Sequence, residues 1–312
     1  MDKTLPSKNA ALFSSLESAL IKYKSVKKLL DAGHREKIFK YPIMVTLSKF
    51  LIKVFPSTAS WFVVENKLFS GVPFFTEGYY MDYRLCGLPN SDPEIRLTKY
   101  FIKNIIPDDI FFDVGANFGF YTVLAHAILG DDPARRIAQI HAFEPTPPIF
   151  KVLSKNVGRK NVVLNNFALG IINGEADFVF FDSIKEFNGL SANMNEEEFK
   201  IVGHTVKKVL VRTLDDYCEK EEVVPTIMKI DVEGSEGEVL RGGLSIIARN
   251  HPIIVMEIHT TEKHRAAAKI LMDMGYSLYG IDDHGDLMAK TTTYLENLTE
   301  LDNLVFKQQS DR

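Results

Sequence analysis

The chain has 312 residues, of which 46% are hydrophobic and 25% charged, and this balance is that of an ordinary globular protein with ample core. The net charge of −4 argues against a protein that binds nucleic acid over its whole surface. Two cysteines, Cys86 and Cys218, exclude a cysteine-rich zinc site and a disulfide framework, and they predict a reducing, cytoplasmic compartment.

The N-terminal region differs from the rest in charge. Residues 1–70 carry 12 Lys/Arg and 5 Asp/Glu, a net of +7, and the remainder, with 25 and 36, carries −11. Apolar residues at helical spacing predict helices over 9–30 and 43–55, and therefore a helical extension over residues 1–70. Its basic faces are expected to be solvated, with a membrane surface or a homo-oligomer contact as alternatives. Neither a signal peptide nor a stretch of about 18 uncharged apolar residues is found, so no transmembrane helix is expected.

The remaining residues, 71–312, are predicted to form one α/β domain. Aromatic residues between 72 and 86 predict a short hairpin, a helix is expected over 92–106, and Pro107 to Asp109 form a turn. From residue 110 onward strands alternate with helices, which predicts a doubly wound, mostly parallel sheet. The strands are expected over 110–114, 138–143, 161–168, 226–232, 253–258, 276–282, 287–291 and 303–307, the helices over 118–129, 147–157, 235–249 and 262–274, and a β-rich insertion over 174–212.

The most informative segment is Asp113-Val-Gly-Ala-Asn-Phe-Gly119. It follows three hydrophobic residues and precedes a helical pattern, so it predicts a buried strand, a tight turn and a helix N-terminus. Glycine in such a turn lets the backbone approach a ligand closely, and an acid can accept hydrogen bonds from it. The spacing differs from the Gly-x-Gly-x-x-Gly of dinucleotide folds, which makes a nicotinamide-dependent oxidoreductase the weaker interpretation.

Polar side chains recur where the predicted strands end. Ligands of doubly wound sheets bind beyond these carboxyl ends, and several unpaired buried charges at one rim require a reason. Glu144, for example, could accept both hydroxyls of a ribose, or could simply favour the start of the next helix. The residues at these positions are Asp113, Glu144, Asn166, Asp231, Glu233, Glu257 and His259.

A second dense motif is Lys229-Ile-Asp-Val-Glu-Gly-Ser-Glu236. Alternation along the strand places Lys229, Asp231 and Glu233 on one face, where the lysine would neutralise part of the acidic cluster. Ser235 is expected to cap the following helix, with Glu238 completing a capping box.

These blocks together resemble the FkbM family of S-adenosylmethionine-dependent methyltransferases. The resemblance covers about residues 95–290 in unbroken order, and it includes Phe143-Glu144-Pro145, Asn166-Phe-Ala168-Leu, Arg212-Thr-Leu-Asp-Asp216, Val239-Leu-Arg-Gly-Gly243 and Met256-Glu-Ile-His259. It implies a Rossmann-like class I methyltransferase fold, with a seven-stranded sheet and a reversed last hairpin. It also implies S-adenosyl-L-methionine as cofactor and O-methyl transfer to a sugar, glycan or natural product.

The resemblance also implies roles for single residues. Asp113, Gly115, Asn117 and Gly119 would face the methionine end of the cofactor, Glu144 its ribose, and Asn166 to Ala168 its adenine. Asp231, Glu233 and His259 would face the transferred methyl group. The hairpin at 72–86 and the insertion at 174–212 are expected to form the walls of the acceptor site.

Methyl transfer to a hydroxyl benefits from a base that removes its proton as the new bond forms. Asp231 and His259 are the two candidates, and the sequence leaves the choice between them open. No spacing singles out a metal site, and none is predicted. An alternative from another class is an inactive methyltransferase-like scaffold that binds partners through its basic N-terminal helices.

Overall fold

The computed structural model describes residues 93–130, 139–158, 161–181 and 204–308, together with residue 10 and the strand segments 62–65, 73–76 and 189–190. It divides into two compact units, Met1–Lys103 and Asn104–Arg312, each of which is described by itself. The predicted helices over 9–30 and 43–55, with their basic faces, lie outside the described residues apart from residue 10.

In the first unit, two short strands pair antiparallel. Strand β1 (Phe62–Glu65) lies beside β2 (Pro73–Thr76), with Phe62 opposite Thr76. Of the hairpin predicted over 72–86, the structure describes only β2, which pairs with a strand that comes before it in the chain, and the rest lies outside the described residues. Helix α5 (Pro93–Asn104) confirms the helix expected over 92–106, and it buries an apolar stripe that includes Leu97 and Phe101.

The second unit is built on an eight-stranded sheet with the order β13-β12-β14-β11-β10-β3-β4-β5. Five strands run parallel in the centre and at one end, and β14 runs antiparallel to both of its neighbours, β11 and β12. The Rossmann-like class is confirmed. The sheet has eight strands instead of seven because β13 pairs with β12 as an added edge. The strands are β3 (Phe111–Val114), β4 (Ile140–Phe143), β5 (Val162–Asn165), β10 (Ile227–Ile230), β11 (Ile253–Ile258), β12 (Ser277–Ile281), β13 (Leu287–Ala289) and β14 (Asp302–Lys307).

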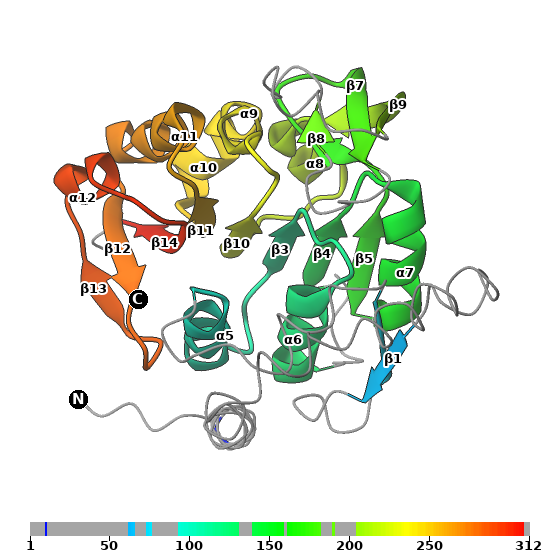
Figure 1. The fold of residues 1–312 in the computed structure, drawn as a ribbon, viewed down its shortest axis with the longest axis horizontal. Coiled ribbons are helices and arrows are strands. Elements are labelled where there is room, and N and C mark those ends of the chain that lie inside the picture. The colour runs from blue at the N-terminus through cyan, green and yellow to red at the C-terminus, as the bar shows by residue number, and fades with distance from the viewer. Residues whose placement is uncertain are drawn as a thin grey trace, which may run out of the picture. The chain divides into compact units, whose positions relative to one another are not determined.

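Helices cover both faces of this sheet (Figure 1). Helix α6 (Phe120–Leu129) lies on one face, and α8 (Leu214–Lys220), α9 (Glu236–Arg241), α10 (Leu244–Asn250) and α11 (Glu262–Asp273) lie on the other. Alternation along the strands separates the faces: Phe112, Met228 and Met256 pack with the helices of the second group, whereas Asp113 and Lys229 point to the α6 side. Helices α7 (Pro147–Val157) and α12 (Thr292–Glu296) complete the set, and no helix of the described residues is long and apolar enough to cross a membrane.

The helix predicted over 235–249 is two helices, α9 and α10, separated at Gly242 and Gly243. A side chain at Gly242 would overlap the backbone of Gly170, and one at Gly243 would meet Leu214. The glycines are therefore required where this segment passes close to two other parts of the chain. The predicted capping box is wrong as well, because the Ser235 side chain makes no capping hydrogen bond.

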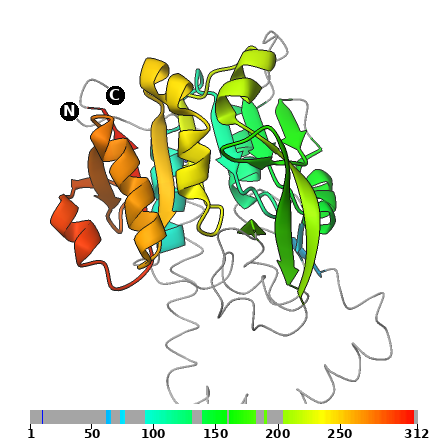
Figure 2. The ribbon, with the colours of Figure 1, turned by 90° about the horizontal axis from the view of Figure 1, so that it is seen from above.

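The β-rich insertion forms a separate four-stranded sheet beside the β4–β5 end of the large one (Figure 2). Its long strands β7 (Gly174–Phe181) and β9 (His204–Arg212) pair antiparallel, with β8 (Gly189–Leu190) and β6 (Ala168–Leu169) at the edges. The strand predicted over 161–168 is present as β5, but its predicted C-terminal end is wrong. The chain leaves the large sheet after Asn165, and Ala168 already pairs with β9.

A buried tyrosine joins helix α8 to the sheet. The Tyr217 hydroxyl lies 2.7 Å from Nδ1 of His141 and accepts a hydrogen bond from Nδ2 of Asn165 at 3.1 Å. Its ring packs against Phe143 with centroids 4.9 Å apart. Burial raises the pKa of Tyr217 well above its usual value, so the hydroxyl stays neutral and can serve both partners.

Replacing Tyr217 with phenylalanine should lower the free energy of unfolding by about 1–3 kcal/mol, because the ring is kept while polar groups buried beside it lose a partner. Urea unfolding followed by circular dichroism measures the change. Tyr279→Phe, on the partly exposed strand β12, is the matched control and should change stability by less than about 0.5 kcal/mol. Equal stability of the two variants would contradict the structural role given to Tyr217.

Candidate active site

The loop after β3 owes its sequence to its backbone conformation. Gly115, Asn117 and Gly119 have φ angles of 80°, 51° and 90°, so every second residue lies in the left-handed region. Glycine adopts this region freely, and asparagine is among the few other residues that tolerate it. The pattern Gly-x-Asn-x-Gly is therefore what this turn needs.

The two glycines of this loop are tight against protein atoms. A methyl group at Gly115 would overlap the carbonyl oxygen of Asp231, at the end of the neighbouring strand β10. One at Gly119 would lie 2.5 Å from Cδ1 of Leu153 in helix α7. The structure therefore shows a close approach of both glycines to other parts of the chain, and the predicted approach to a ligand stays a prediction.

Asp113 is a buried acid with one oxygen in use. Its Oδ2 accepts a hydrogen bond of 2.6 Å from the Thr122 hydroxyl, and its Oδ1 has no partner among the described residues. Burial raises the pKa of Asp113, and the nearby Lys229 opposes that rise. Oδ1 of Asn117 is also buried without a partner in the same part of the chain. Such atoms cost free energy unless a ligand donates to them, so they mark places where a donor is missing.

Glu144 brings three of the predicted site residues together. Its Oε2 accepts from the backbone N–H of Asn117 at 3.1 Å, and its Oε1 accepts from Thr146 N–H at 2.8 Å. The Asn166 side chain in turn donates to the Glu144 carbonyl at 2.8 Å. Burial raises the pKa of Glu144 to about 7 in spite of these hydrogen bonds. Ala168 is not part of this group, because it is buried with Phe178 and Val211 in the small sheet.

Asp231 forms an ion pair at the end of β10. Nζ of Lys229 lies 2.9 Å from Oδ2 of Asp231, and both side chains are almost fully buried. The same ammonium group lies 5.1 Å from the centre of the Tyr121 ring in α6. The neutralising role predicted for Lys229 is therefore realised with Asp231 itself.

His259 is paired with a carboxylate of its own strand. Its Nε2 lies 2.9 Å from Oε2 of Glu257. This hydrogen bond raises the pKa of His259 above its usual value of 6.5, and Asp231 and Glu236 act in the same direction. The His259 ring also stacks against His264, with centroids 4.7 Å apart.

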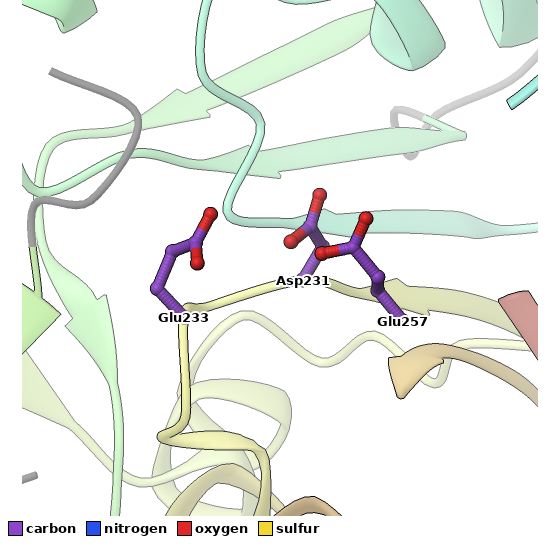
Figure 3. A group of neighbouring side chains, drawn as sticks. All are labelled: Asp231, Glu233 and Glu257. Carbon is purple, nitrogen blue, oxygen red and sulfur yellow. The ribbon is translucent and has the colours of Figure 1, made fainter. Parts of the chain in front are cut away.

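Three carboxyl groups meet at this edge. Asp231, Glu233 and Glu257 can each place an oxygen within 4.8 Å of the others, and their side chains point to the same side (Figure 3). The register explains two of them: Lys229 pairs with Val255 in the parallel ladder, so Asp231 and Glu257, two residues further on, are neighbours. Asp231 and Glu257 already have partners in Lys229 and His259. The absence of a metal stays a prediction.

Glu233 is held in an unusual backbone conformation. Its φ is 53°, and that of Gly234 is 92°. A left-handed glutamate costs about 1–2 kcal/mol and persists only where the surroundings enforce it. Glu236 helps to enforce this backbone conformation, since its buried Oε1 accepts hydrogen bonds from the backbone N–H groups of Val232 and Gly234 at 3.1 and 3.2 Å. Sequence reasoning gave Glu236 no such role and attributed the helix start to Ser235 and Glu238.

Comparisons with known proteins identify the domain. Residues 113–278 match the family model "Methyltransferase FkbM domain". Over 192 residues the chain is 28% identical to the hexuronic acid methyltransferase AglP of Haloferax volcanii, covering 61% of this chain and 72% of that protein. It is 27% identical to the 31-O-demethyl-FK506 methyltransferase FkbM of Streptomyces tacrolimicus, covering 44% and 60%. The crystal structure of a methyltransferase FkbM from Methylobacillus flagellatus is 15% identical, with a TM-score of 0.42 over 69% of this chain and 50% of that one.

Proposed function

Because the chain belongs to the FkbM family of S-adenosylmethionine-dependent methyltransferases, we propose that it transfers a methyl group to a hydroxyl of a sugar, with a hexuronic acid as the first acceptor to test. The acceptor class rests on one relative, the hexuronic acid methyltransferase AglP. The observation that supports transfer to a hydroxyl is the Glu257–His259 pair, a histidine hydrogen-bonded to a carboxylate at the rim of the sheet. A second relative, the 31-O-demethyl-FK506 methyltransferase FkbM, is named for a substrate that lacks an O-methyl group, and the match spans 60% of that protein.

The residues at the rim suit the polar groups of S-adenosylmethionine. Oδ1 of Asp113 and Oδ1 of Asn117 are buried acceptors, and we assign them to the ammonium group of the methionine end. Glu144 keeps further lone pairs on both oxygens and would accept the ribose hydroxyls. Gly115 and Gly119 would contribute to cofactor binding by allowing the backbone conformation of the loop after β3. Asn166 would contribute by holding the backbone of Glu144 through its hydrogen bond to the Glu144 carbonyl.

His259 is the better base of the two candidates. Asp231 is committed to a buried ion pair with Lys229, whereas His259 carries a nitrogen whose basicity Glu257 increases. When bound, S-adenosylmethionine supplies an electrophilic methyl group whose bond to sulfur breaks during the transfer, with the neutral thioether S-adenosylhomocysteine as the leaving group. His259 would take the hydroxyl proton as the oxygen forms its bond to carbon, and Asp231 and Glu233 would orient the acceptor.

Two titrations and one transfer assay test this function. Calorimetry should give a clear isotherm with S-adenosylmethionine and no heat with NAD, and a heat only with NAD would support the oxidoreductase alternative. With methyl-labelled cofactor, label should then appear in glucuronic or galacturonic acid. Cofactor binding without transfer to any sugar would favour the scaffold alternative. The predicted contacts of residues 1–70 with membranes or a second copy, and the acceptor walls at 72–86 and 174–212, stay predictions.

The affinity for the cofactor should depend on pH through Glu144. The pKa of Glu144 is raised to about 7, and only the ionised carboxylate accepts from both ribose hydroxyls. Protonation therefore competes with binding, and Kd should rise up to about tenfold for each pH unit below 7. Calorimetric titration between pH 5.5 and pH 8, values chosen to bracket that pKa, measures this.

Glu144→Gln is the control for this pH dependence. It keeps the size of the side chain but cannot ionise, so its affinity should be weaker than that of the wild type at pH 8 and nearly constant across the range. A wild-type Kd that does not change through pH 7 would remove Glu144 from the ribose site.

A further inference from the structure

The hydrogen bond between Glu257 and His259 determines which ring nitrogen of the histidine is basic. An ionised carboxylate can only accept hydrogen bonds, so the atom 2.9 Å from Oε2 of Glu257 is Nε2 carrying a proton. In the neutral ring the lone pair then lies on Nδ1. Among the residues that the structure describes, Nε2 is the ring atom of His259 that makes a hydrogen bond.

The ring is held on a second side by helix α11. His264 stacks on His259 with ring planes inclined by 41°, and its own Nδ1 lies 2.6 Å from the Thr261 hydroxyl. Nε2 of His264 is 3.5 Å from Oε2 of Glu236, the residue that shapes the loop after β10. Burial lowers the pKa of His264 to about 4, so this neighbour is neutral near pH 7 and adds no positive charge beside His259.

We propose that Glu257 is a positioning residue that holds His259 in the tautomer whose Nδ1 takes the proton of the acceptor hydroxyl. The proposal rests on the proposed methyl transfer, and it identifies Nδ1 of His259 as the atom that acts as the base. Glu257 suits this role because its side chain is only 11% exposed and comes from a strand fully buried between two others. The wrong tautomer presents an N–H where a lone pair is needed, and such an error costs up to about 10⁴-fold in rate in hydrolases that use a histidine base.

The charged and titratable groups around His259 come from every element packed near it. Glu257 on β11, Asp231 after β10 and Glu236 at the start of α9 all favour the protonated ring, and His264 on α11 is neutral. Removing the charge of Glu257 should therefore lower the pKa of His259 and also release its tautomer.

Nitrogen NMR of the whole protein, with ¹⁵N-labelled histidine, tests the proposal without any acceptor. In the wild type above the pKa of His259, Nε2 should carry the proton and Nδ1 should not. In Glu257→Gln the tautomers should mix or reverse, and the pKa of His259 should fall. Glu262→Gln removes the same charge from an exposed position near the start of α11 and should change neither property. His259→Ala identifies the signal by its disappearance.

The wild-type spectrum alone can overturn the proposal, since a neutral His259 with its proton on Nδ1 would contradict it whether or not the variant folds. Activity gives a second readout. In Glu257→Gln, kcat should fall by roughly 10²–10⁴-fold, its acid limb should move to lower pH, and the Kd of the cofactor should stay within about twofold. Glu257→Asp, which keeps the charge, should recover part of the activity.

Two further outcomes distinguish a failure of the positioning role of Glu257 from a failure of the proposed methyl transfer. If EDTA abolished activity, Mg²⁺ restored it and Glu257→Gln weakened Mg²⁺ binding, Glu257 would be a cation ligand with Asp231 and Glu233, and the positioning role would be wrong. If the wild-type tautomer were as expected but no sugar accepted a methyl group, the proposed function would fail. The tautomer assignment would then stand on its own.

Discussion

Gly115→Ala is expected to weaken S-adenosylmethionine binding by about 100-fold or more, the scale on which a displacement of about 1 Å acts in a preorganised site. The added methyl group would overlap the carbonyl oxygen of Asp231, and alanine is disfavoured at a φ of 80°. The loop after β3 and the end of β10 would have to move apart. Asn117 lies on the first of these segments and Asp231 follows the second, so the proposed cofactor contact of Asn117 and the proposed acceptor contact of Asp231 would both be displaced. Calorimetric titration measures the affinity.

A second glycine provides the control for Gly115. Gly158, at the end of α7, has open space where a side chain would be added, so Gly158→Ala should bind the cofactor as the wild type does. Circular dichroism and thermal unfolding would show whether Gly115→Ala stays folded, with a melting temperature several degrees lower expected from the strain. A folded Gly115→Ala protein with unchanged affinity would show that the contact with Asp231 does not position the cofactor loop.

His259→Ala is expected to reduce kcat by about 10²–10⁴-fold, the usual contribution of a general base, while the Kd of the cofactor stays within about twofold. The variant should affect kcat but not Kd because His259 lies away from the atoms assigned to the cofactor. His259 lies after β11 beside Glu257, whereas the atoms assigned to the cofactor belong to the end of β3 and to the loops after β3 and β4. Initial rates with labelled cofactor and a hexuronic acid give kcat, and calorimetry gives Kd.

The same role of His259 as a base predicts how kcat of the wild type depends on pH. A base must be neutral to accept a proton, and the pKa of His259 is raised above 6.5, so kcat should fall as the pH drops through that raised value. His284→Ala removes an exposed histidine from the turn before β13 and should leave kcat unchanged. If His259→Ala turned over like His284→Ala, the base would have to be sought at Asp231.

The existence of the five parallel strands could be predicted because each is a short, mostly apolar run that polar residues follow at the rim, as at Asp231 and Glu144. Their ends were less well predicted, since the strand expected over 226–232 ends at Ile230. The helix over 147–157 was predicted with its observed ends, since Pro147 and Gly158 delimit it on either side. These helix ends are determined by neighbouring residues in the sequence, so they can be predicted without knowing the rest of the fold.

The predicted helix and strand ends are wrong where contacts between segments far apart in the sequence determine them. The break at Gly242 depends on the backbone of Gly170, and the end of β5 at Asn165 depends on a strand that arrives more than 40 residues later. No sequence pattern shows that Glu236 holds the loop before it. Likewise, the sequence placed Lys229 near the acidic cluster but could not show that it pairs with Asp231, or that His259 pairs with Glu257.

The position of β14 has a consequence for how the domain is made. This strand, the last of the sheet in the chain, fills the space between β11 and β12, and it pairs antiparallel with both. During synthesis the β12–β13 hairpin therefore has no partner in the sheet until residues 302–307 have left the ribosome. The five parallel strands meanwhile expose the unpaired edge of β11, and such an edge is open to pairing with another chain. The arrival of β14 covers this edge, because it pairs with β11 on one side and with β12 on the other.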